Sequence, residues 1–317
     1  MKSISKTEPT LKPRRPRGRM AREEERAAYL FLLPWLIGLV VFLIGPIIAS
    51  VIISMTDWNL VSSPQWVGLA NYQEMLFDDR NFWQSIRVTL YYTVLSVPLF
   101  MVSGLGLSLL LNMRLKGMNW FRTLLYLPSV LSGVAVAVLW VSLLNPDLGA
   151  VNWVLRGLGV ANPPRWLSSP QWAVPSVVLM GMWGVGGSAI IYLAGLQNIP
   201  PQLYEAATID GAGAWRKFIH ITIPMLTPTL FFVLITSLLG AFQVFDTAFV
   251  LGGSRGGTSG ALRFYLLNMW TEGFRNGRLG YASALAWVLV LLAAIVIMIM
   301  FRTSARWVYY EHDATKA

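Results

Sequence analysis

The chain contains no cysteine and only two histidines among its 317 residues. Without cysteine it can form no disulfide, no thiolate metal site and no thiol nucleophile. The histidines are His220, in a polar segment between two apolar runs, and His312, near the end of the chain. Neither accompanies a set of acidic or nucleophilic side chains, so we expect no metal site and no enzyme activity.

Charged side chains are also scarce, at 13% of the sequence, whereas hydrophobic ones make up 55%. This composition is too apolar for a soluble domain. About 20 apolar residues are needed to cross a bilayer as a helix. Six runs qualify, namely Tyr29–Met55, Ile86–Leu111, Thr123–Leu144, Ala173–Ala194, Leu226–Phe249 and Tyr281–Phe301. We therefore predict an all-α membrane bundle of six transmembrane helices over 29–303, between a basic tail (1–28) and a second tail (304–317).

Basic residues outnumber acidic ones, and the net charge is +10. Nine of the basic residues precede Tyr29, so the positive-inside rule predicts a cytoplasmic amino terminus. With six spans the carboxyl terminus returns to the same side. The segment 251–280, with four arginines, disagrees with this orientation. The run Arg14–Arg19 could bind RNA in isolation, but contact with anionic lipid explains the tail, and we expect no nucleic-acid partner.

ATP binding requires a Gly-rich loop that ends in Lys and then Ser or Thr. The nearest candidate is GGSRGGT, Gly252–Thr258, which has Thr258 where the lysine must stand. We therefore expect the chain to bind neither ATP nor any other cofactor. Any energy from nucleotide hydrolysis must come from a partner.

A polar, helix-forming segment at 200–224 lies between two of the apolar runs. Pro200 and Pro201 suit the first turn of a helix, where a missing N–H group costs little. Gly211 and Gly213 permit a sharp turn after it. Trp215, Phe218 and Ile219 then share one face of a second short helix, which should stop or kink at Pro224. The pattern predicts a helix, a turn and a helix at the membrane face.

This segment resembles the signature loop of permease subunits of bacterial ABC importers. The pattern is Glu-Ala-Ala, three residues, Gly, nine residues, Ile, one residue, Leu and Pro, and Ile223 stands here in place of the Leu. The stretch from Leu193 to Ala212 is similar to the carbohydrate-uptake branch, which includes maltose and glycerol-phosphate permeases. The matching and neighbouring positions are Glu205, Ala206, Ala207, Asp210, Gly211, Trp215, Phe218, Ile221 and Pro224.

The resemblance implies a type I ABC importer permease fold and a loop that docks in a groove of an ATPase subunit. It further implies a complex of two permease subunits, commonly non-identical, two ATPases and an extracytoplasmic solute-binding protein. Without the resemblance, the same segment also fits an amphipathic connector on the membrane surface, with Glu205 placed favourably near a helix N-terminus.

Polar groups inside the spans are candidates for a solute path, because they are costly to bury unless they face water, solute or one another. In the fifth span these are Thr236, Ser237, Gln243 and Asp246, of which Gln243 and Asp246 are the candidates for the solute path. The aromatic residues Trp183 and Tyr192 could contact sugar rings. Asp246 could instead cap the span or pair with an arginine of the following segment. The aromatic residues could equally be packing or interface residues.

Two glycine-rich stretches each admit two interpretations. The run LGGSRGGTSG before Leu262 resembles the external loop of sugar permeases, in contact with the binding protein, and it also fits a flexible linker. The run from Gly181 to Ala189 could pack against another subunit or within the chain.

An ion- or proton-coupled secondary transporter that works alone is the alternative function. Such a transporter should carry ionisable residues near mid-bilayer and an internal repeat. The sequence shows no convincing repeat, and the only carboxylate within the predicted spans is Asp246, near the outer end of the fifth. An ABC importer permease for a sugar or sugar-like solute is therefore the favoured interpretation.

Overall fold

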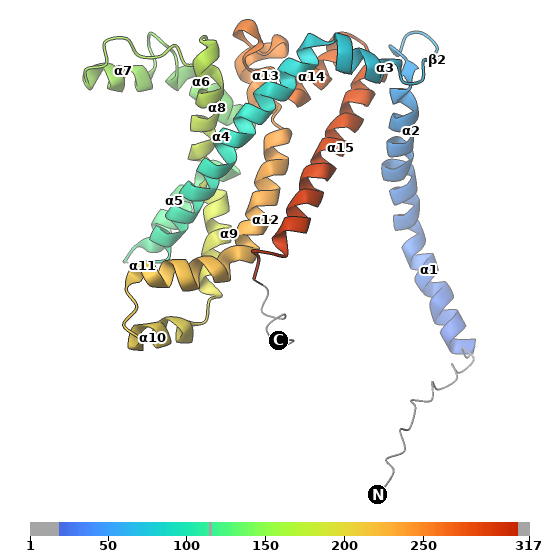
Figure 1. Ribbon diagram of the computed structural model, residues 1–317. Coiled ribbons are helices and arrows are strands. Elements are labelled where there is room, and N and C mark those ends of the chain that lie inside the picture. Colours follow the sequence, from blue (N-terminus) through green and yellow to red (C-terminus); the bar gives the residue numbers. More distant parts are fainter. Residues whose placement is uncertain (1–18, 114–115, 310–317) are drawn as a thin grey trace, which may run out of the picture. The chain divides into compact units, whose positions relative to one another are not determined.

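The computed structural model describes residues 19–113 and 116–309, and Figure 1 shows a protein built almost entirely of helices. Most of the two predicted tails, with His312, lies outside the described residues. The chain divides into two units, Met1–Ile52 and Ile53–Ala317, and each is described by itself.

The first unit contains α1 (Arg19–Leu39), a π-helical turn η1 (Val40–Ile44) and most of α2 (Gly45–Ser54). Helix α1 begins at Arg19 and therefore includes the last residues of the predicted basic tail. The apolar stretch Arg26–Ser54 is long enough to span a bilayer.

The second unit begins with a two-stranded antiparallel hairpin that pairs β1 (Thr56–Asp57) with β2 (Gln65–Trp66). The helices up to the polar segment are α3 (Ala70–Gln73), η2 (Glu74–Asp78), α4 (Arg80–Leu111), α5 (Met118–Val130), α6 (Gly133–Leu143), α7 (Ala150–Gly157), α8 (Pro170–Trp183) and α9 (Gly186–Gln197). The remaining helices are α10 (Pro201–Ile209), α11 (Ala214–Lys217), η3 (Phe218–Thr222), α12 (Ile223–Phe242), α13 (Asp246–Gly252), η4 (Gly253–Arg255), η5 (Thr258–Gly260), α14 (Tyr265–Trp270), η6 (Thr271–Arg275) and α15 (Leu279–Ser304).

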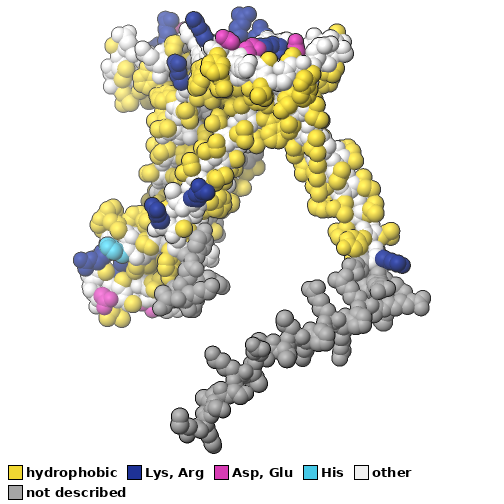
Figure 2. Space-filling model, turned by 45° about the vertical axis from the view of Figure 1, so that its right-hand side comes forward, with side chains coloured by type: hydrophobic (Ala, Val, Ile, Leu, Met, Phe, Trp, Pro, Cys, Tyr) yellow, Lys and Arg dark blue, Asp and Glu magenta, His cyan; other side chains and the backbone are white. Residues whose placement is uncertain are grey.

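The prediction of a helical membrane protein is confirmed. Within the described residues, four helical stretches are long and apolar enough to cross a bilayer, and the number reaches six if each of two bent helix pairs forms one span. Figure 2 shows hydrophobic side chains covering the middle of these helices, while charged ones gather mainly toward the ends.

Three of the predicted spans are not continuous helices, contrary to expectation. The third bends by 97° between α5 and α6, and the fourth bends by 50° between α8 and α9. The fifth stops at Phe242, and the chain leaves helical geometry before α13 begins at Asp246. Hydropathy measures only length and apolar content, so it cannot detect a break that leaves both halves apolar.

Helix α4 lies at the centre of the packing in the second unit. It packs on α8, α9, α12 and α14, and the Thr89 hydroxyl in α4 accepts the Tyr265 N–H of α14 at 2.9 Å. At Gly104 a β-carbon would lie 2.7 Å from the Ser188 hydroxyl of α9. The close contact of α4 with α9 therefore depends on this glycine.

Prolines within the spans mostly do not break them, because Pro98, Pro175 and Pro228 lie inside helices. Before Pro224, the π turn η3 lets the Ile223 N–H reach the Phe218 carbonyl. The helix therefore does not stop at Pro224, although Figure 1 shows the expected change of direction between α11 and α12.

The glycine-rich segment before α14 is folded and is not a flexible linker. Gly256 and Gly260 of this segment are buried, and Leu262 and Phe264, which follow it, are almost fully buried. The arginines of 251–280 are also largely bound within the fold. Arg263 donates to the Asn268 side chain at 3.3 Å, and Arg278 lies 2.5 Å from Glu74 of η2.

The Arg278 guanidinium is half-buried and connects η6 and α15 to η2. Burial lowers its pKa, but the hydrogen bond that the guanidinium donates to Glu74 and the charges of Glu74 and Glu272 outweigh burial, so the pKa lies above its usual value. The guanidinium also stacks 4.4 Å from the Tyr281 ring centre. These contacts join η2, η6 and the start of α15 at the end of the bundle that carries α13 and α14.

The chain beyond α15 packs at the opposite end of the bundle. The Tyr309 N–H donates to the Thr227 hydroxyl at 2.9 Å, and the Trp307 ring lies 5.7 Å from the Phe231 ring. The end of α15 and the 200–224 loop therefore lie at the same end of the second unit, as Figure 1 shows.

Candidate functional site

The first arm of the 200–224 loop is α10, whose start and end follow from its sequence. Pro200 precedes the helix and Pro201 occupies its first turn, as predicted. Gly211 has a φ of +72°, and its N–H donates to the Thr208 carbonyl at 3.1 Å. The Ala212 N–H donates to the Ala207 carbonyl at 2.8 Å. This pair of bonds is a Schellman motif, which needs a residue in the left-handed region at Gly211.

The second arm consists of α11 and η3 and continues into α12. Gly213, which precedes α11, has an ordinary negative φ, so only Gly211 needs glycine's conformational freedom. The Lys217 ammonium donates to the Thr208 hydroxyl at 2.7 Å, and the hydroxyls of Tyr204 and Thr222 lie 2.9 Å apart. Sequence reasoning missed these two bonds, because they join positions with no periodic relation.

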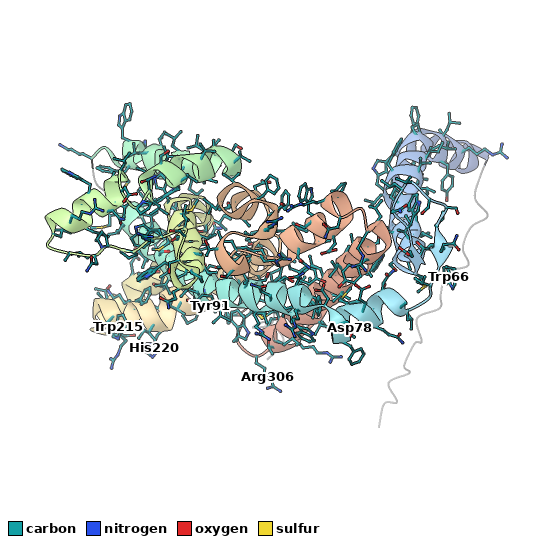
Figure 3. The ribbon with its side chains drawn as sticks, turned by 90° about the horizontal axis from the view of Figure 1, so that it is seen from above. Trp66, Asp78, Tyr91, Trp215, His220 and Arg306 are labelled. Carbon is teal, nitrogen blue, oxygen red and sulfur yellow. The ribbon has the colours of Figure 1, made fainter. Side chains whose placement is uncertain are left out.

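The surface of the loop exposes apolar side chains. Ile209 is 87% exposed, and Trp215 is 72% exposed and stacks on Phe218 at 5.7 Å. Glu205 and Ala206 are exposed on α10 as well, and Glu205 forms no ion pair with any residue that the structure describes. Figure 3 labels Trp215 and His220 at the edge of the bundle. Exposed apolar groups of this size are typical of a surface that binds another protein.

The base of the loop is packed against the spans. Leu196, Ile199 and Leu226 form a buried cluster that contacts Tyr204 and Ile221. Pro224 is half-buried at the start of α12. Between the two arms lies a hollow of about 490 Å³, lined by Ala207, Asp210, Ala212, Arg216, Lys217, His220 and Ile221. The loop is thus a fixed projection of α9 and α12.

A second site lies where the three broken spans meet. A cavity of about 560 Å³ is bordered by Pro128, Leu131 and Gly133 of the α5–α6 bend, by Gly184 of the α8–α9 bend, and by residues 243–247 of the α12–α13 break. Helix breaks at membrane depth are tolerated where the freed backbone groups line a cavity or are buried in protein. Three breaks around one cavity therefore point to a site for a polar solute.

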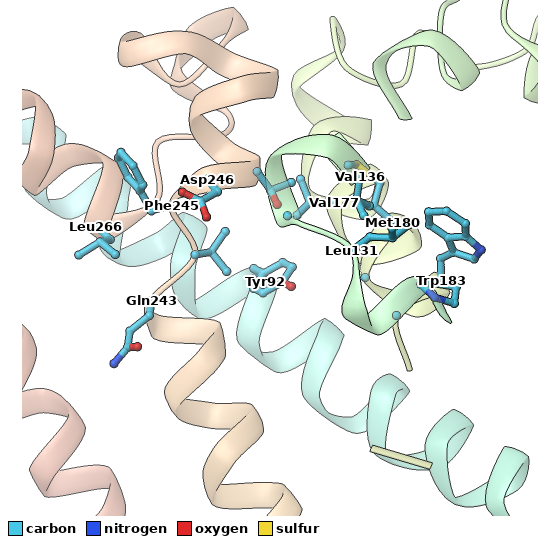
Figure 4. A pocket seen from close by; sticks show the side chains of 16 residues that line it. Tyr92, Leu131, Val136, Val177, Met180, Trp183, Gln243, Phe245, Asp246 and Leu266 are labelled. Atoms are coloured by element: carbon cyan, nitrogen blue, oxygen red, sulfur yellow. The ribbon is translucent and has the colours of Figure 1, made fainter. Parts of the chain in front are cut away.

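The side chains of the cavity come from opposite walls (Figure 4). Gln243 and Asp246 lie on the α12–α13 wall, Met180 and Trp183 lie on the α8 wall, and Tyr92 of α4 lies between them. Gln243, Asp246 and Trp183 were candidates from the sequence. Tyr92 and Met180 were not, because the sequence does not show which of the many aromatic and apolar residues in the spans face a cavity.

Asp246 occupies the first turn of α13, where a negative charge is favourable. It forms no ion pair with any described arginine, including the four in 251–280. Its carboxylate lies 3.9 Å from the position that a β-carbon on Gly133 would take. Asp246 therefore lies on the cavity wall, across the α6–α13 contact.

Tyr192 is placed differently from the other three candidates. It is fully buried in α9, it does not line the cavity, and its ring lies beside Gly104 of α4. The glycines near Trp183 serve packing within the chain. A β-carbon on Gly186 would lie 1.9 Å from the Leu125 carbonyl oxygen, and one on Gly181 would lie 2.4 Å from the Phe100 ring.

Comparison with known proteins finds relatives along nearly the whole chain. Residues 80–310 match the family of binding-protein-dependent transport system inner membrane components. A probable ABC transporter permease protein of Bacillus subtilis, YesP, is 38% identical and covers 93% of this chain and 96% of its own length. The trehalose/maltose transport system permease protein MalF of Thermococcus litoralis is 37% identical over 86% of this chain and 92% of its own.

A solved structure has the same fold. It is a chain of the bacterial alginate ABC transporter in complex with an alginate pentasaccharide-bound periplasmic protein. It aligns with a TM-score of 0.80 and 27% identity, and covers 91% of this chain and 98% of its own length. The chain described here therefore belongs to the family of binding-protein-dependent transport system inner membrane components, multi-pass proteins of the inner membrane.

Proposed function

We propose that this chain is one of two permease subunits of an ABC importer that takes up a sugar or an oligosaccharide. Relatives named for trehalose and maltose, lactose and arabinooligosaccharides support this substrate class. The second permease, two ATPase subunits and an extracytoplasmic binding protein complete the complex. ATP is bound by the ATPase subunits, and the permease takes no cofactor.

The 200–224 loop is the surface that binds an ATPase subunit. Its exposed Ile209 and Trp215 supply an apolar contact, while its base is buried against α9 and α12. A surface that is exposed at its tip and fixed at its base transmits a displacement to the spans without bending. ATP must bind the two states of the transporter with free energies that differ by about 5.5 kcal/mol for a near-complete population reversal.

The cavity at the three helix breaks is this chain's share of the solute path. The Trp183 ring offers a flat apolar face, and Gln243 and Asp246 offer hydrogen-bonding groups. Sugars carry both apolar CH faces and hydroxyl groups, so this combination fits them. The basic amino-terminal tail (1–28) and the carboxyl-terminal tail (304–317) are cytoplasmic, and 29–303 forms the membrane domain.

The observation that carries the proposal is the projection of an apolar-tipped, rigidly based loop that matches the ABC permease signature. The test is sugar uptake and ATP hydrolysis by the complete complex in proteoliposomes with loaded binding protein. Glu205→Lys should abolish uptake without changing the affinity of the binding protein for sugar. Arg302→Glu, a charge reversal of equal size outside the loop at the same end, is the matched control. Full uptake by Glu205→Lys would contradict the assignment.

A further inference from the structure

A groove on the surface of the bundle joins an apolar wall to a basic one. The apolar part has a volume of about 280 Å³ and lies between α4 and α15, with Ile86 and Leu90 on one side and Leu289, Leu292 and Val296 on the other. Beside it lies a hollow of about 480 Å³ lined by Arg80, Trp83, Gln84 and Arg87. Trp83 lines both.

Trp83 is held in place between the two parts. Its indole N–H donates to the Leu76 carbonyl at 3.0 Å, and its ring packs edge-on against Phe82 at 5.2 Å. Tryptophan near the end of a membrane-spanning helix, as Trp83 is in α4, is typical of the level of lipid headgroups. The apolar part therefore lies at acyl-chain depth beneath it, and the basic part lies at headgroup depth.

The two arginines have no partner in the described part of the chain. Arg80 and Arg87 are exposed, and neither forms an ion pair or a side-chain hydrogen bond there. The nearby Asp79 is bound by the Tyr281 hydroxyl at 2.6 Å and by the Asn81 N–H at 2.7 Å. Arg80 and Arg87 are seven residues apart on α4, which is about 10 Å along the helix axis. Two long side chains at this separation can reach toward the same headgroup.

Side chains that line the groove are exposed, with Leu90 at 50% and Leu292 at 38%. Figure 3 shows α4, between the labelled Asp78 and Tyr91, along the edge of the second unit. We propose that this groove binds one anionic phospholipid, whose acyl chain lies between α4 and α15 and whose phosphate lies between Arg80 and Arg87. The apolar wall fits a hydrocarbon chain, and two unpartnered guanidinium groups fit a negative headgroup. This site is separate from the solute cavity and does not depend on the substrate.

Native mass spectrometry of the purified complex tests the proposal, with added phosphatidylglycerol or phosphatidylcholine of identical acyl chains. We expect the complex to retain phosphatidylglycerol preferentially. The double variant Arg80→Gln, Arg87→Gln should lower its retention by about thirtyfold, because each basic group near a membrane surface contributes about 1 kcal/mol. Arg165→Gln with Arg255→Gln removes the same charge from exposed positions outside the groove and should leave retention unchanged.

A second pair of variants tests the apolar wall. Leu292→Trp should fill the groove and reduce retention of both lipids, whereas Leu291→Trp, on the same helix but outside the groove, should not. Equal retention of the two lipids, or no effect of the arginine pair, would overturn the proposal. Displacement of the lipid by inorganic phosphate alone would identify a free-anion site instead. Crosslinking of the variant Leu292→Cys to another subunit would show that a protein helix covers the groove and would also overturn the proposal.

Discussion

The hydroxyl of Tyr204 in α10 lies 2.9 Å from the hydroxyl of Thr222 in η3, and this contact closes the base of the 200–224 loop. Thr222 is buried, and Tyr204 contacts the cluster around Leu226. The two arms of the loop therefore share one foundation, which continues into α12. A force applied to α10 reaches α12 through this contact as well as through the backbone.

Removal of the Tyr204 hydroxyl should loosen this connection. Tyr204→Phe leaves the Thr222 hydroxyl with only a weak contact to the Lys217 carbonyl at 3.5 Å, at a cost of about 1 kcal/mol. We expect fewer sugars transported per ATP hydrolysed, measured in proteoliposomes. Thr222→Val should have a similar effect, and the double variant should be no worse than either single one. Additive losses would show that the two hydroxyls act independently.

Gly211 should tolerate only residues that enter the left-handed region. No atom outside the glycine's own neighbourhood lies within 4 Å of an added β-carbon, so any effect of substitution comes from the backbone. A left-handed conformation costs an ordinary residue about 1–2 kcal/mol, and a β-branched one more. Gly211→Val should reduce the uptake rate at least about fivefold. Gly211→Asn is the control and should retain most activity. An equal loss in both variants would show that the added side chain clashes with a partner subunit and that backbone strain is not the cause.

Asp246 should affect solute affinity if it faces the solute. A hydrogen bond to a charged acceptor is worth about 1 kcal/mol more than one to a neutral acceptor. Asp246→Asn should therefore raise the KM for uptake by about five- to tenfold, with the ATPase rate in the absence of sugar unchanged. Unchanged KM would assign the carboxylate to the N-terminus of α13 alone.

Gly186 should be intolerant of any side chain. A β-carbon there would lie 1.9 Å from the Leu125 carbonyl oxygen, so α5 and α9 would have to separate. Gly186→Ala should lower the free energy of unfolding by about 1–3 kcal/mol, which a thermal unfolding measurement on the purified complex detects as a lower Tm. Gly106→Ala, in α4 with no atom within 4 Å of the added carbon, should be neutral or slightly stabilising. Similar stability of the two variants would contradict the observed α5–α9 contact.

Local signals predicted the 200–224 loop well. The prolines at its start and the Schellman turn at Gly211 depend on neighbouring residues and on backbone geometry, which the sequence displays directly. The bonds Tyr204–Thr222 and Lys217–Thr208 depend on how two arms fold together, and no local pattern reports that.

The sequence located the apolar runs but did not predict the shape of the spans. Pro128 lies three residues before the α5–α6 break begins at Leu131, yet Pro98, Pro175 and Pro228 lie within helices, so proline alone does not identify a break. The cavity, which depends on three breaks coming together, could not be predicted as a site. Tyr192 illustrates the same limit, since an aromatic residue in a span can face a cavity or a neighbouring helix.

The arginines of 251–280 explain why a simple charge count is ambiguous there. Arg278 is bound to Glu74 and Glu272, and Arg263 to Asn268, so these charges serve the fold. The positive-inside rule counts only the number and position of lysines and arginines, so it does not separate residues that serve the fold from residues that set the orientation.

The central claim is that ATPase subunits drive solute movement through this chain by way of the 200–224 loop. The most direct measurement is sugar accumulation in proteoliposomes that contain the permease pair with or without the ATPase subunits, with ATP and loaded binding protein supplied. The account predicts accumulation against a gradient only when the ATPases are present, and its loss in Glu205→Lys. Accumulation against a gradient by the permease pair alone would contradict it.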